Sequence, residues 1–375
     1  MEYRVNHAGK DVVFSVDDIN NSYLKQCALA ALKKFYGQFS PANGGDTVLT
    51  YRLTDNLDSH FRTEACSIMS ESAKINDTQV FMSGHGNKFG YEFTPDGHLS
   101  AIYYQLSSPS RIDNNKSKAV SRAFQSNVEL QIMMMYSRGF LHGLQLANLE
   151  HGASFMHACS FAVGDNGYIV AATPGAGKSS LLLAMSFDEG INACFISDDF
   201  ACIDSDGHAH HIGRSMAIKS HQIQYFPGLK DRLGDMSTLQ KLQWFLLKQK
   251  GLKRMATPEQ IFEGRITTNI PVRRAIYLTN HNRDTFEHEP MSASDFANLN
   301  ANMLFSELFL GMEIVNHSLF LPGNHLLPTA DKFISDTRKT LTGVFTSISC
   351  ELVKVPFRSD PRDLLKYLKS EHLIG

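Results

Sequence analysis

The chain has 375 residues, of which 43% are hydrophobic and 20% are charged, a composition typical of globular proteins that bury a full-sized core. The formal net charge of −2 gives no general attraction to nucleic acids or anionic membranes, so we expect neither as a partner. Six scattered cysteines without a C-x-x-C pair indicate neither a disulfide framework nor a thiolate metal site. No signal region or membrane-spanning apolar segment stands out, and we therefore expect a cytoplasmic protein.

The first hundred residues predict an N-terminal α+β domain. A pair of short strands is followed by a helix that is expected to end near Tyr36. Further along, the turn Thr94-Pro-Asp-Gly97 joins the strands of a hairpin, because Pro-Asp-Gly favours a tight turn. Residues 107–118 are polar and rich in turn formers, which favours a linker. We therefore predict two domains, residues 1–118 and residues 119–375.

The second domain contains the pattern of a phosphate-binding loop. A predicted hairpin, residues 154–172, leads into Thr173-Pro-Gly-Ala-Gly-Lys-Ser179, and the chain then resumes as an apolar helix. Gly175 and Gly177 let backbone N–H groups turn toward an anion, and Lys178 adds a positive charge beside the positive end of the helix. The pattern predicts nucleotide binding.

This loop matches the consensus G-x-x-x-x-G-K-[ST] except at its first position, which is Ala172. The hydroxyl of Ser179 is expected to hold the Mg²⁺ of the nucleotide. An ordinary strand–turn–helix with a lysine at the helix start is the structural alternative. The residues predicted to bind the nucleotide are Pro174, Gly175, Ala176, Gly177, Lys178, Ser179 and Ser180.

Two carboxylates follow the next predicted strand. Residues 193–197 form an apolar run that ends at Asp198-Asp199. A strand–loop–helix–strand crossover returns the second strand parallel to the first, so both carboxyl ends lie at the same edge of the sheet. We therefore expect Asp198 and Asp199 beside the bound phosphates, although an Asp pair after a strand also caps turns.

Further histidines and cations have two interpretations. The run His208-Ala-His-His211 favours an exposed hairpin over a metal site, because no partner pattern of ligands accompanies it. Arg214, Lys219 and His221 either contact phosphate oxygens or are solvated. The elements predicted for the C-terminal part are a helix over residues 236–251, strands over 266–270 and 275–278 bracketed by Arg265 and Arg273-Arg274, helices over 292–315 and 330–345, a strand over 351–355 and a helix over 359–368.

Three of these elements carry a family resemblance. Met156-His157-Ala158, the loop at residues 173–179 and Ile196-Ser-Asp-Asp-Phe200 together resemble the HPr kinase/phosphorylase group and its relatives in the phosphoenolpyruvate-carboxykinase-like superfamily. The resemblance covers the segment from residue 150 to residue 220. It implies an α/β fold, α+β overall, in which a P-loop core of mixed sheet plus helices follows the N-terminal α+β domain.

The resemblance also implies roles for single residues. Lys178 and the loop amides hold the phosphates of ATP, and Ser179 and Asp199 hold Mg²⁺. Asp198 is the base that takes the proton from the acceptor hydroxyl, and His157 lies behind Asp198 and orients it. Asp198, His157 and Lys178 are thus the predicted catalytic residues.

These roles predict an ATP-dependent kinase that transfers the γ-phosphoryl group to a Ser-type hydroxyl of a protein or peptide. A small-molecule hydroxyl kinase is one alternative, and a regulatory nucleotide-binding ATPase that transfers nothing is the other. The bifunctional members of the family have a Glu where this chain has Ser180, and residues 212–219 match their second signature poorly. Phosphorolysis and HPr as the acceptor are therefore not expected. A homo-oligomer is implied by the resemblance alone.

Overall fold

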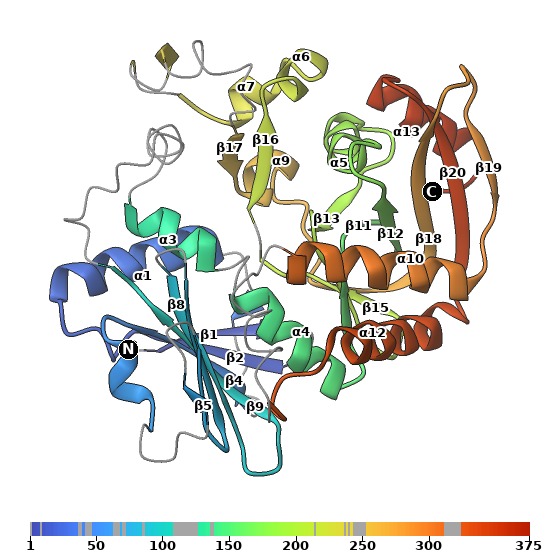
Figure 1. Ribbon diagram of the computed structural model, residues 1–375. Helices are drawn as coiled ribbons and strands as arrows, with labels where there is room; N and C mark the ends of the chain where they lie inside the picture. Colours follow the sequence, from blue (N-terminus) through green and yellow to red (C-terminus); the bar gives the residue numbers. More distant parts are fainter. Residues whose placement is uncertain are drawn as a thin grey trace. The chain divides into compact units, whose positions relative to one another are not determined.

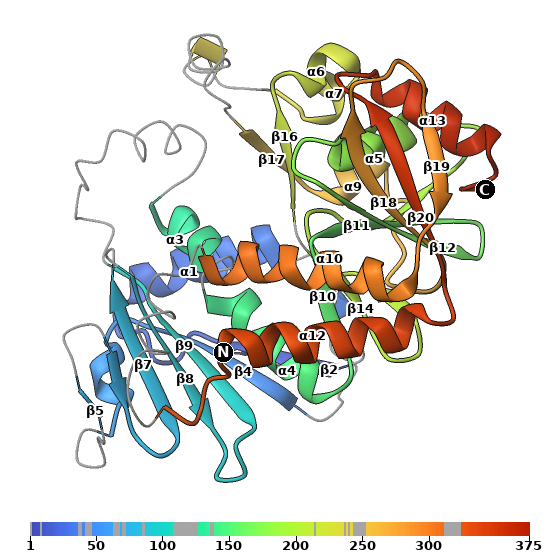
Figure 2. The ribbon, with the colours of Figure 1, turned by 45° about the vertical axis from the view of Figure 1, so that its right-hand side comes forward.

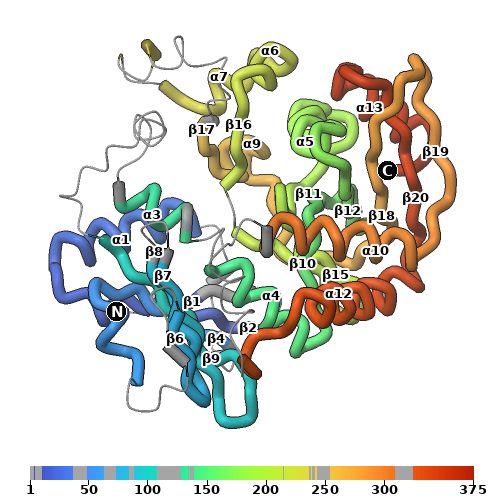
Figure 3. The backbone as a smooth tube through the Cα atoms, viewed as in Figure 1, coloured from blue at the N-terminus to red at the C-terminus, as the bar shows by residue number. Residues whose placement is uncertain are grey.

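The computed structural model divides the chain into two compact units (Figures 1 and 2). Unit 1 consists of Met1–Gly152 and Leu304–Thr337, and unit 2 consists of Ala153–Met303 and Arg338–Gly375. The structure describes residues 2–7, 10–36, 40–41, 47–62, 68–69, 73–84, 87–107, 127–135, 139–213, 215–235, 238, 241–242, 253–310 and 324–375, which are coloured along the backbone in Figure 3. None of the helices within these ranges is long and apolar enough to cross a membrane.

Unit 1 is built on a mixed sheet in which nine strands are described, in the order β3-β1-β2-β4-β9-β8-β7-β6-β5 (Figure 1, blue to cyan). β2, β4 and β9 run parallel to one another, and the other neighbours are antiparallel. The elements are β1 (Glu2–His7), β2 (Lys10–Ser15), α1 (Ser22–Tyr36), β3 (Ser40–Pro41), β4 (Thr47–Thr54), the 3-10 helix η1 (Leu57–His60), β5 (Ile68–Met69), β6 (Ala73–Ile75), β7 (Gln79–Gly84), β8 (Asn87–Phe93), β9 (Leu99–Gln105), α3 (Asn127–Met135) and α4 (Leu141–Glu150).

The helices α3 and α4 belong to unit 1, not to a second domain that begins at residue 119. α4 packs against β4 and β9, and α3 packs against α1. At the start of α4, the ring of Phe140 lies 5.6 Å from Phe14 and 5.2 Å from Tyr51. The boundary therefore lies at Gly152 and not at residue 118, because these apolar helices bury their faces on the sheet of unit 1. Residues 108–118 of the predicted linker lie outside the described residues.

Unit 2 is an α/β unit whose mixed sheet has the order β10-β14-β15-β18-β12-β11-β13, with β20 paired to β18 and β19. Its strands are β10 (Ser154–Met156), β11 (Ala158–Val163), β12 (Asn166–Ala172), β13 (Cys194–Ser197), β14 (Ala201–Ile203), β15 (His208–His210), β16 (Met216–Lys219), β17 (Lys253–Ala256), β18 (Asn269–His281), β19 (Glu287–Pro290) and β20 (Ser349–Pro356). Its helices are α5 (Lys178–Phe187), α6 (Gln222–Tyr225), α7 (Leu229–Arg232), α9 (Pro258–Phe262), most of α10 (Ala293–Phe305), the second half of α12 (Ala330–Phe345) and α13 (Pro361–Ser370). The predicted α/β class of the chain is confirmed.

Apolar residues of the central strand β12 face two different cores. Val170 belongs to a cluster that also contains Leu182 of α5 and Leu365 of α13. Ile169 belongs to a second cluster with Phe296 of α10. Successive side chains of a strand point to opposite faces, so an uninterrupted apolar run is what a strand covered on both faces requires. Figure 2 shows α5 and α13 on one face of this sheet and α10 on the other.

The strands β12 and β13 run in the same direction although they are not neighbours. β11 lies between them and is antiparallel to each. Because two antiparallel steps restore the original direction, β12 and β13 both end at the same edge of the sheet. The expected placement of the residues after β13 beside the loop after β12 is confirmed, with one antiparallel strand between the two.

The strand predicted over residues 275–278 and the last two residues of the one predicted over 266–270 belong to a single strand, β18, whereas Ile266 forms an isolated bridge with Phe195. The first residues of β18 pair with β15 and its later residues pair with β12 and β20. The strand runs through Arg273 and Arg274, and its pairing with β12 shifts register between Val272 and Arg274. Arg273 is exposed, and Arg274 Nη1 donates to the carbonyl of His372 at 2.6 Å. The arginines therefore lie inside the strand and do not end it, because the backbone hydrogen bonds between strands can form whether the side chains are charged or apolar.

The remaining long helices agree in part with the sequence. α10 ends at Phe305 and continues as a π-helical turn over Ser306–Leu310, while residues 311–315 lie outside the described residues. The predicted helix over residues 236–251 also falls almost entirely outside them. The helix over Ala330–Phe345 and the final helix, which Asp360 caps through a hydrogen bond from the N–H of Arg362, are confirmed.

Candidate functional site

The loop between β12 and α5 requires its two glycines. Gly175 has φ +86° and Gly177 has φ +102°, in the region that side chains with a Cβ rarely adopt. A Cβ at either position would meet no atom within 4 Å, so the requirement comes from the backbone conformation and not from crowding. The loop is anchored by a hydrogen bond from the N–H of Thr173 to the carbonyl of Leu278 on β18, at 3.0 Å.

The amino end of α5 is left without a capping side chain. The N-cap position is occupied by Gly177, which has no side chain to accept a hydrogen bond from the first turn of the helix. Since the first N–H groups of a helix have no partner within the helix, they are available to an anion. Lys178, the first residue of α5, is 8% exposed. The helix start thus combines N–H groups that have no partner within the helix with a largely buried cation, the combination that the sequence predicts.

The carboxyl end of α5 is fixed by two arginines. The carbonyl oxygen of Ser186 accepts hydrogen bonds from Arg232 Nη1 at 3.1 Å and from Arg265 Nη2 at 2.7 Å. Arg265 also donates from Nε to the carbonyl of Phe262 at 3.0 Å. Cations at a helix carboxyl end are favoured by the helix dipole. Arg265 is therefore engaged in holding α5, and a ligand is not needed to explain it.

Asp198 lies directly against the phosphate loop. Ser179 Oγ donates a hydrogen bond of 3.0 Å to Asp198 Oδ1, and the same oxygen accepts from the N–H of Asp199 at 2.9 Å. Asp198 is only 6% exposed. The structure therefore brings together the loop serine, in the helix after β12, and the first carboxylate, in the loop after β13. The two are neighbours because β12 and β13 end at the same edge of the sheet.

Asp199 lies on the solvent side of Asp198 in an unusual turn. It has φ +70°, and the N–H of Phe200 donates to the carbonyl of Asp198 at 2.9 Å, so Asp199 is the central residue of a γ-turn with positive φ, a rare and strained conformation. Its carboxylate Oδ1 lies 3.7 Å from His157 Nε2, and its side chain is 42% exposed. The resemblance places His157 behind Asp198, and the structure also brings its Nε2 within 3.7 Å of the Asp199 carboxylate.

The donor set at this edge suits a hard cation. The hydroxyl of Ser179 and the carboxylates of Asp198 and Asp199 are oxygen ligands, which Mg²⁺ prefers. Ser179 Oγ and Asp198 Oδ1 already lie 3.0 Å apart, so both oxygens could serve as neighbouring ligands of one cation, with the serine hydroxyl keeping its proton and turning it away from Asp198. Mg²⁺ normally keeps several waters and binds phosphate oxygens as well, so a site with few protein ligands fits this ion.

One residue that sequence reasoning missed connects this site to the next segment. Gln222, at the start of α6, is 3% exposed and donates from Nε2 to Ser180 Oγ at 3.3 Å. Its Oε1 accepts from the N–H of Lys219 at 2.7 Å. A single glutamine in a polar stretch belongs to no recognisable sequence motif, so the sequence alone did not indicate Gln222. Of the other predicted cations, Lys219 and His221 are exposed, and Arg214 lies outside the described residues.

The histidine-rich hairpin is more buried than the sequence predicts. His210 and His211 are each 4% exposed. His210 Nε2 pairs with Asp204 Oδ2 at 2.6 Å, and His211 Nδ1 lies 2.5 Å from the carbonyl of Ile196. Within the described parts of the chain, no group of three or more His, Cys, Asp or Glu residues is arranged to hold a metal. A carboxylate across the hairpin and a carbonyl of β13 thus give these buried histidines polar partners.

Cys159 on β11 lies beneath the loop but is not a reactive thiol. Burial raises the pKa of the Cys159 thiol, and the neighbouring Asp198 carboxylate raises it further. Its Sγ points to the carbonyl of Lys178 at 3.9 Å. Since the thiolate is the nucleophilic form, Cys159 is a packing residue of this site.

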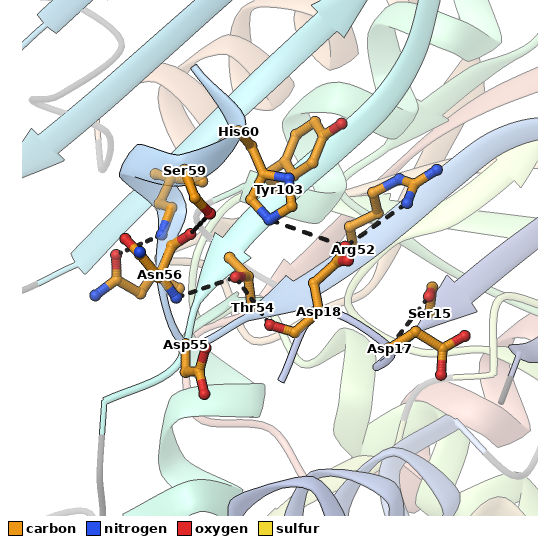
Figure 4. Close-up of polar contacts among 12 residues, drawn as sticks. Ser15, Asp17, Asp18, Arg52, Thr54, Asp55, Asn56, Ser59, His60 and Tyr103 are labelled. Carbon is orange, nitrogen blue, oxygen red and sulfur yellow. Dashed lines mark hydrogen bonds and ion pairs between the residues drawn. The ribbon is translucent and has the colours of Figure 1, made fainter. Parts of the chain in front are cut away.

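Unit 1 has a polar cluster of its own at the ends of β2 and β4 (Figure 4). Asp18 Oδ2 lies 3.6 Å from Arg52 Nη1 and 4.0 Å from His60 Nε2, and the His60 ring packs against Tyr103 with a centroid distance of 5.1 Å. Tyr103 in turn donates to Glu92 Oε2 at 2.6 Å. These contacts tie η1 and the loop after β2 to the sheet, and no sequence pattern pointed to them.

Comparisons with known proteins add little beyond this geometry. No protein-family model matches the sequence, and no curated protein matches it significantly. Among solved structures, the chain is similar to the Hpr(Ser) kinase/phosphatase from Coxiella burnetii, with 11% identity and a TM-score of 0.29, over 59% of this chain and 96% of that one. A likeness at this level carries no conclusion about the fold or function of this chain.

Proposed function

We propose that unit 2 binds ATP with Mg²⁺ and transfers the terminal phosphoryl group to a hydroxyl of a protein, peptide or small-molecule acceptor. The observation that carries the proposal is the hydrogen bond from Ser179 Oγ to Asp198 Oδ1, which joins a phosphate loop to a pair of carboxylates. Phosphoryl transfer needs neutralisation of phosphate charge, a fixed geometry and an acceptor for the hydroxyl proton. The residues at this edge of the sheet can supply each of these.

The first step is the binding of the phosphate chain. The amides of the loop and of the first turn of α5 point to the same side as the positive end of the helix, and Lys178 adds a full charge from a largely buried position. Ser179 and Asp198 would hold Mg²⁺, which withdraws charge from the phosphates when it is bound.

Asp199 is the better candidate for the base. Asp198 is buried and engaged with Ser179, whereas the Asp199 carboxylate is 42% exposed and lies 3.7 Å from His157. In the proposed step Asp199 takes the proton of the acceptor hydroxyl, and the acceptor oxygen bonds to the γ-phosphorus. The bond from that phosphorus to the bridging oxygen breaks, and ADP leaves. This assignment exchanges the roles that the family resemblance implies for the two carboxylates.

The test is incubation of the purified full chain with γ-labelled ATP, Mg²⁺ and a cell lysate. We expect the label on a defined acceptor, and no labelling with Lys178→Ala, whose circular dichroism should match the wild type. Release of labelled free phosphate without any labelled acceptor would favour the regulatory ATPase. A chain that neither binds nor turns over ATP would overturn the proposal.

A further inference from the structure

The strand β13 contains one residue more than the part of β11 with which it pairs. Ser160 of β11 lies opposite Ser197, but the next residue of β11, Phe161, lies opposite Phe195. Ile196 is therefore the extra residue of a β-bulge. A bulge leaves its extra residue out of the regular pairing and re-aims the side chains that follow. This bulge lies at the end of β13, directly before the pair of carboxylates.

The two cores of unit 2 show which way the side chains of β13 point. Phe195 belongs to the core on the α5 side of the sheet, and Ile196 belongs to the core on the α10 side. Side chains alternate along a regular strand. Unbroken alternation would therefore return Ser197 to the α5 side and turn Asp198 to the α10 side, away from the phosphate loop.

The hydroxyl of Ser197 shows that the alternation is broken. Its Oγ lies 2.6 Å from the Oγ of Ser160, and both residues are buried. Ser160 points to the α10 side, because Ala158 and Ala162, two residues before and after it on β11, belong to the core on that side. Ser197 therefore lies on the same side of the sheet as Ile196.

Asp198 consequently returns to the α5 side. Its Oδ1 accepts the hydrogen bond from Ser179 Oγ of α5. Its carboxylate also raises the pKa of the Cys159 thiol, which belongs to the core on the α5 side. The bulge thus decides the face of the sheet on which the inner carboxylate lies.

A buried histidine binds the backbone of the extra residue. His211 Nδ1 lies 2.5 Å from the carbonyl oxygen of Ile196. Since a carbonyl oxygen can only accept, Nδ1 carries the proton and donates it. His211 is 4% exposed, its ring meets Phe195 edge-on with a centroid distance of 5.9 Å, and its backbone N–H donates to the carbonyl of Thr268 at 2.9 Å. The imidazole therefore holds the bulge from a fixed position.

We propose that this β-bulge aims Asp198 at the phosphate loop, and that His211 and the hydroxyl pair of Ser160 and Ser197 are positioning residues of the Mg²⁺ site. This inference rests on the proposed function. The three side chains act on the two residues that precede Asp198. Groups that orient a metal ligand from outside the coordination sphere typically change metal affinity by about 10- to 100-fold when they are lost.

The experiment measures the affinity of the full chain for Mg·ATP and for metal-free ATP by calorimetry. His211→Phe keeps an aromatic ring and removes the donor. We expect it to lower the ratio of the two affinities about tenfold, which corresponds to about 1.4 kcal/mol, and to change the metal-free affinity by less than about threefold. His211→Asn places an amide N–H near the position of Nδ1 and should retain most of the ratio.

His210→Phe is the matched control. His210 is as buried as His211, but its imidazole pairs with Asp204 and not with β13. The control should lower the stability of unit 2 and leave the affinity ratio at the wild-type value. A positioning role lowers the ratio, whereas a general packing defect lowers both affinities together, so a parallel loss of both affinities in His211→Phe would contradict the inference.

Ser197→Ala tests the same bulge by a second route. It removes the hydroxyl partner of Ser160 and should lower the affinity ratio in the same direction. A ratio that stays at the wild-type value in His211→Phe, or in Ser197→Ala where His211→Phe does not fold, overturns this inference alone. A wild-type chain that binds neither form of ATP overturns the proposed function and this inference with it.

Discussion

Ser179 Oγ and Asp198 Oδ1 lie 3.0 Å apart, although one residue begins α5 and the other follows β13. The contact depends on the order β12-β11-β13, in which one antiparallel strand separates two strands of the same direction. A carboxylate that is buried and already bound to the loop serine has little freedom to move toward an acceptor. Under the proposed function, the inner carboxylate, Asp198, would hold the metal and the outer one, Asp199, would take the proton.

The division predicts different defects for Asp198→Asn and Asp199→Asn. Loss of the inner carboxylate should abolish the dependence of ATP affinity on Mg²⁺, because a metal ligand is removed. Loss of the outer one should leave Mg·ATP affinity near the wild-type value and lower the transfer rate about 10²- to 10⁴-fold, the usual contribution of a general base. Calorimetry with and without Mg²⁺, together with single-turnover transfer, measures both. The opposite pattern would restore Asp198 as the base.

The phosphate loop predicts a conformational cost for an added Cβ. Gly177→Ala must place a side chain at φ +102°, and we expect it to lose about 1–2 kcal/mol of stability and most of its nucleotide affinity. Since no atom lies within 4 Å of the new Cβ, crowding contributes nothing. Gly343→Ala is the matched control, because Gly343 is exposed in α12 with equally open space. It should gain about 0.5–1 kcal/mol in urea unfolding. Equal effects at the two positions would contradict the backbone argument.

Loss of the arginine hydrogen bonds at the carboxyl end of α5 should lower the stability of the protein. Arg265→Ala removes hydrogen bonds to the carbonyls of Ser186 and Phe262, and we expect a loss of about 2–3 kcal/mol because both acceptors are partly buried. Arg265→Lys should recover only part of it, since an ammonium cannot reproduce the planar set of donors. Arg273→Ala, at an exposed position of β18, should cost far less. Urea unfolding followed by the far-ultraviolet signal measures the series, and an Arg265→Ala protein as stable as Arg273→Ala would refute the role.

The buried His142 predicts that unit 1 is weakened by acid. Burial lowers the pKa of His142 to about 3, against about 6.5 in an unfolded chain. Between these values the unfolded chain binds a proton that the folded chain does not. The stability that neutral His142 contributes is therefore complete above about pH 6.5 and falls by up to about 1.4 kcal/mol for each pH unit below it.

Hydrogen exchange of the α4 amides at about pH 7 and about pH 5, corrected for intrinsic rates, measures this loss within unit 1 alone. His142→Gln removes the titrating group and should show a flatter dependence on pH. If that variant does not fold, the ring resonances of wild-type His142 give a second readout, because they should remain those of a neutral imidazole at about pH 5. Protonation of the folded chain at that pH would contradict the prediction.

The sequence predicts the centre of unit 2 well, for reasons that are local. An uninterrupted apolar run up to Ala172, two glycines and an apolar helix after Lys178 each carry their own signal, and the crossover rule then places the Asp pair. The orientation of His157 toward Asp199 could not be predicted in the same way. It depends on the γ-turn at Asp199, and no residue preference distinguishes that turn from an ordinary one.

Other parts of the fold depend on contacts between distant segments. His210 and His211 looked like surface residues because Asp204 and the carbonyl of Ile196 are partners only after folding. Gln222 was missed because its importance comes from Ser180, 42 residues earlier in the chain. The sequence places the unit boundary at residue 118, because the segment before it is polar and rich in turn formers. The structure places it at Gly152, because α4 packs on β4 and β9 of unit 1.

The division of the chain has a consequence for its synthesis. Unit 1 takes its last segment, Leu304–Thr337, after most of unit 2 has been made, and unit 2 in turn ends with Arg338–Gly375. Neither unit can therefore be complete before its last segment, Leu304–Thr337 for unit 1 and Arg338–Gly375 for unit 2, has been synthesised. Domains that fold during synthesis normally do so one after the other. Here the segments of the two units alternate along the chain, so unit 1 cannot be completed before most of unit 2 has been synthesised. Truncation after Gly152 would remove part of unit 1 as well as all of unit 2, so the shortened chain would lack residues that complete the fold of unit 1.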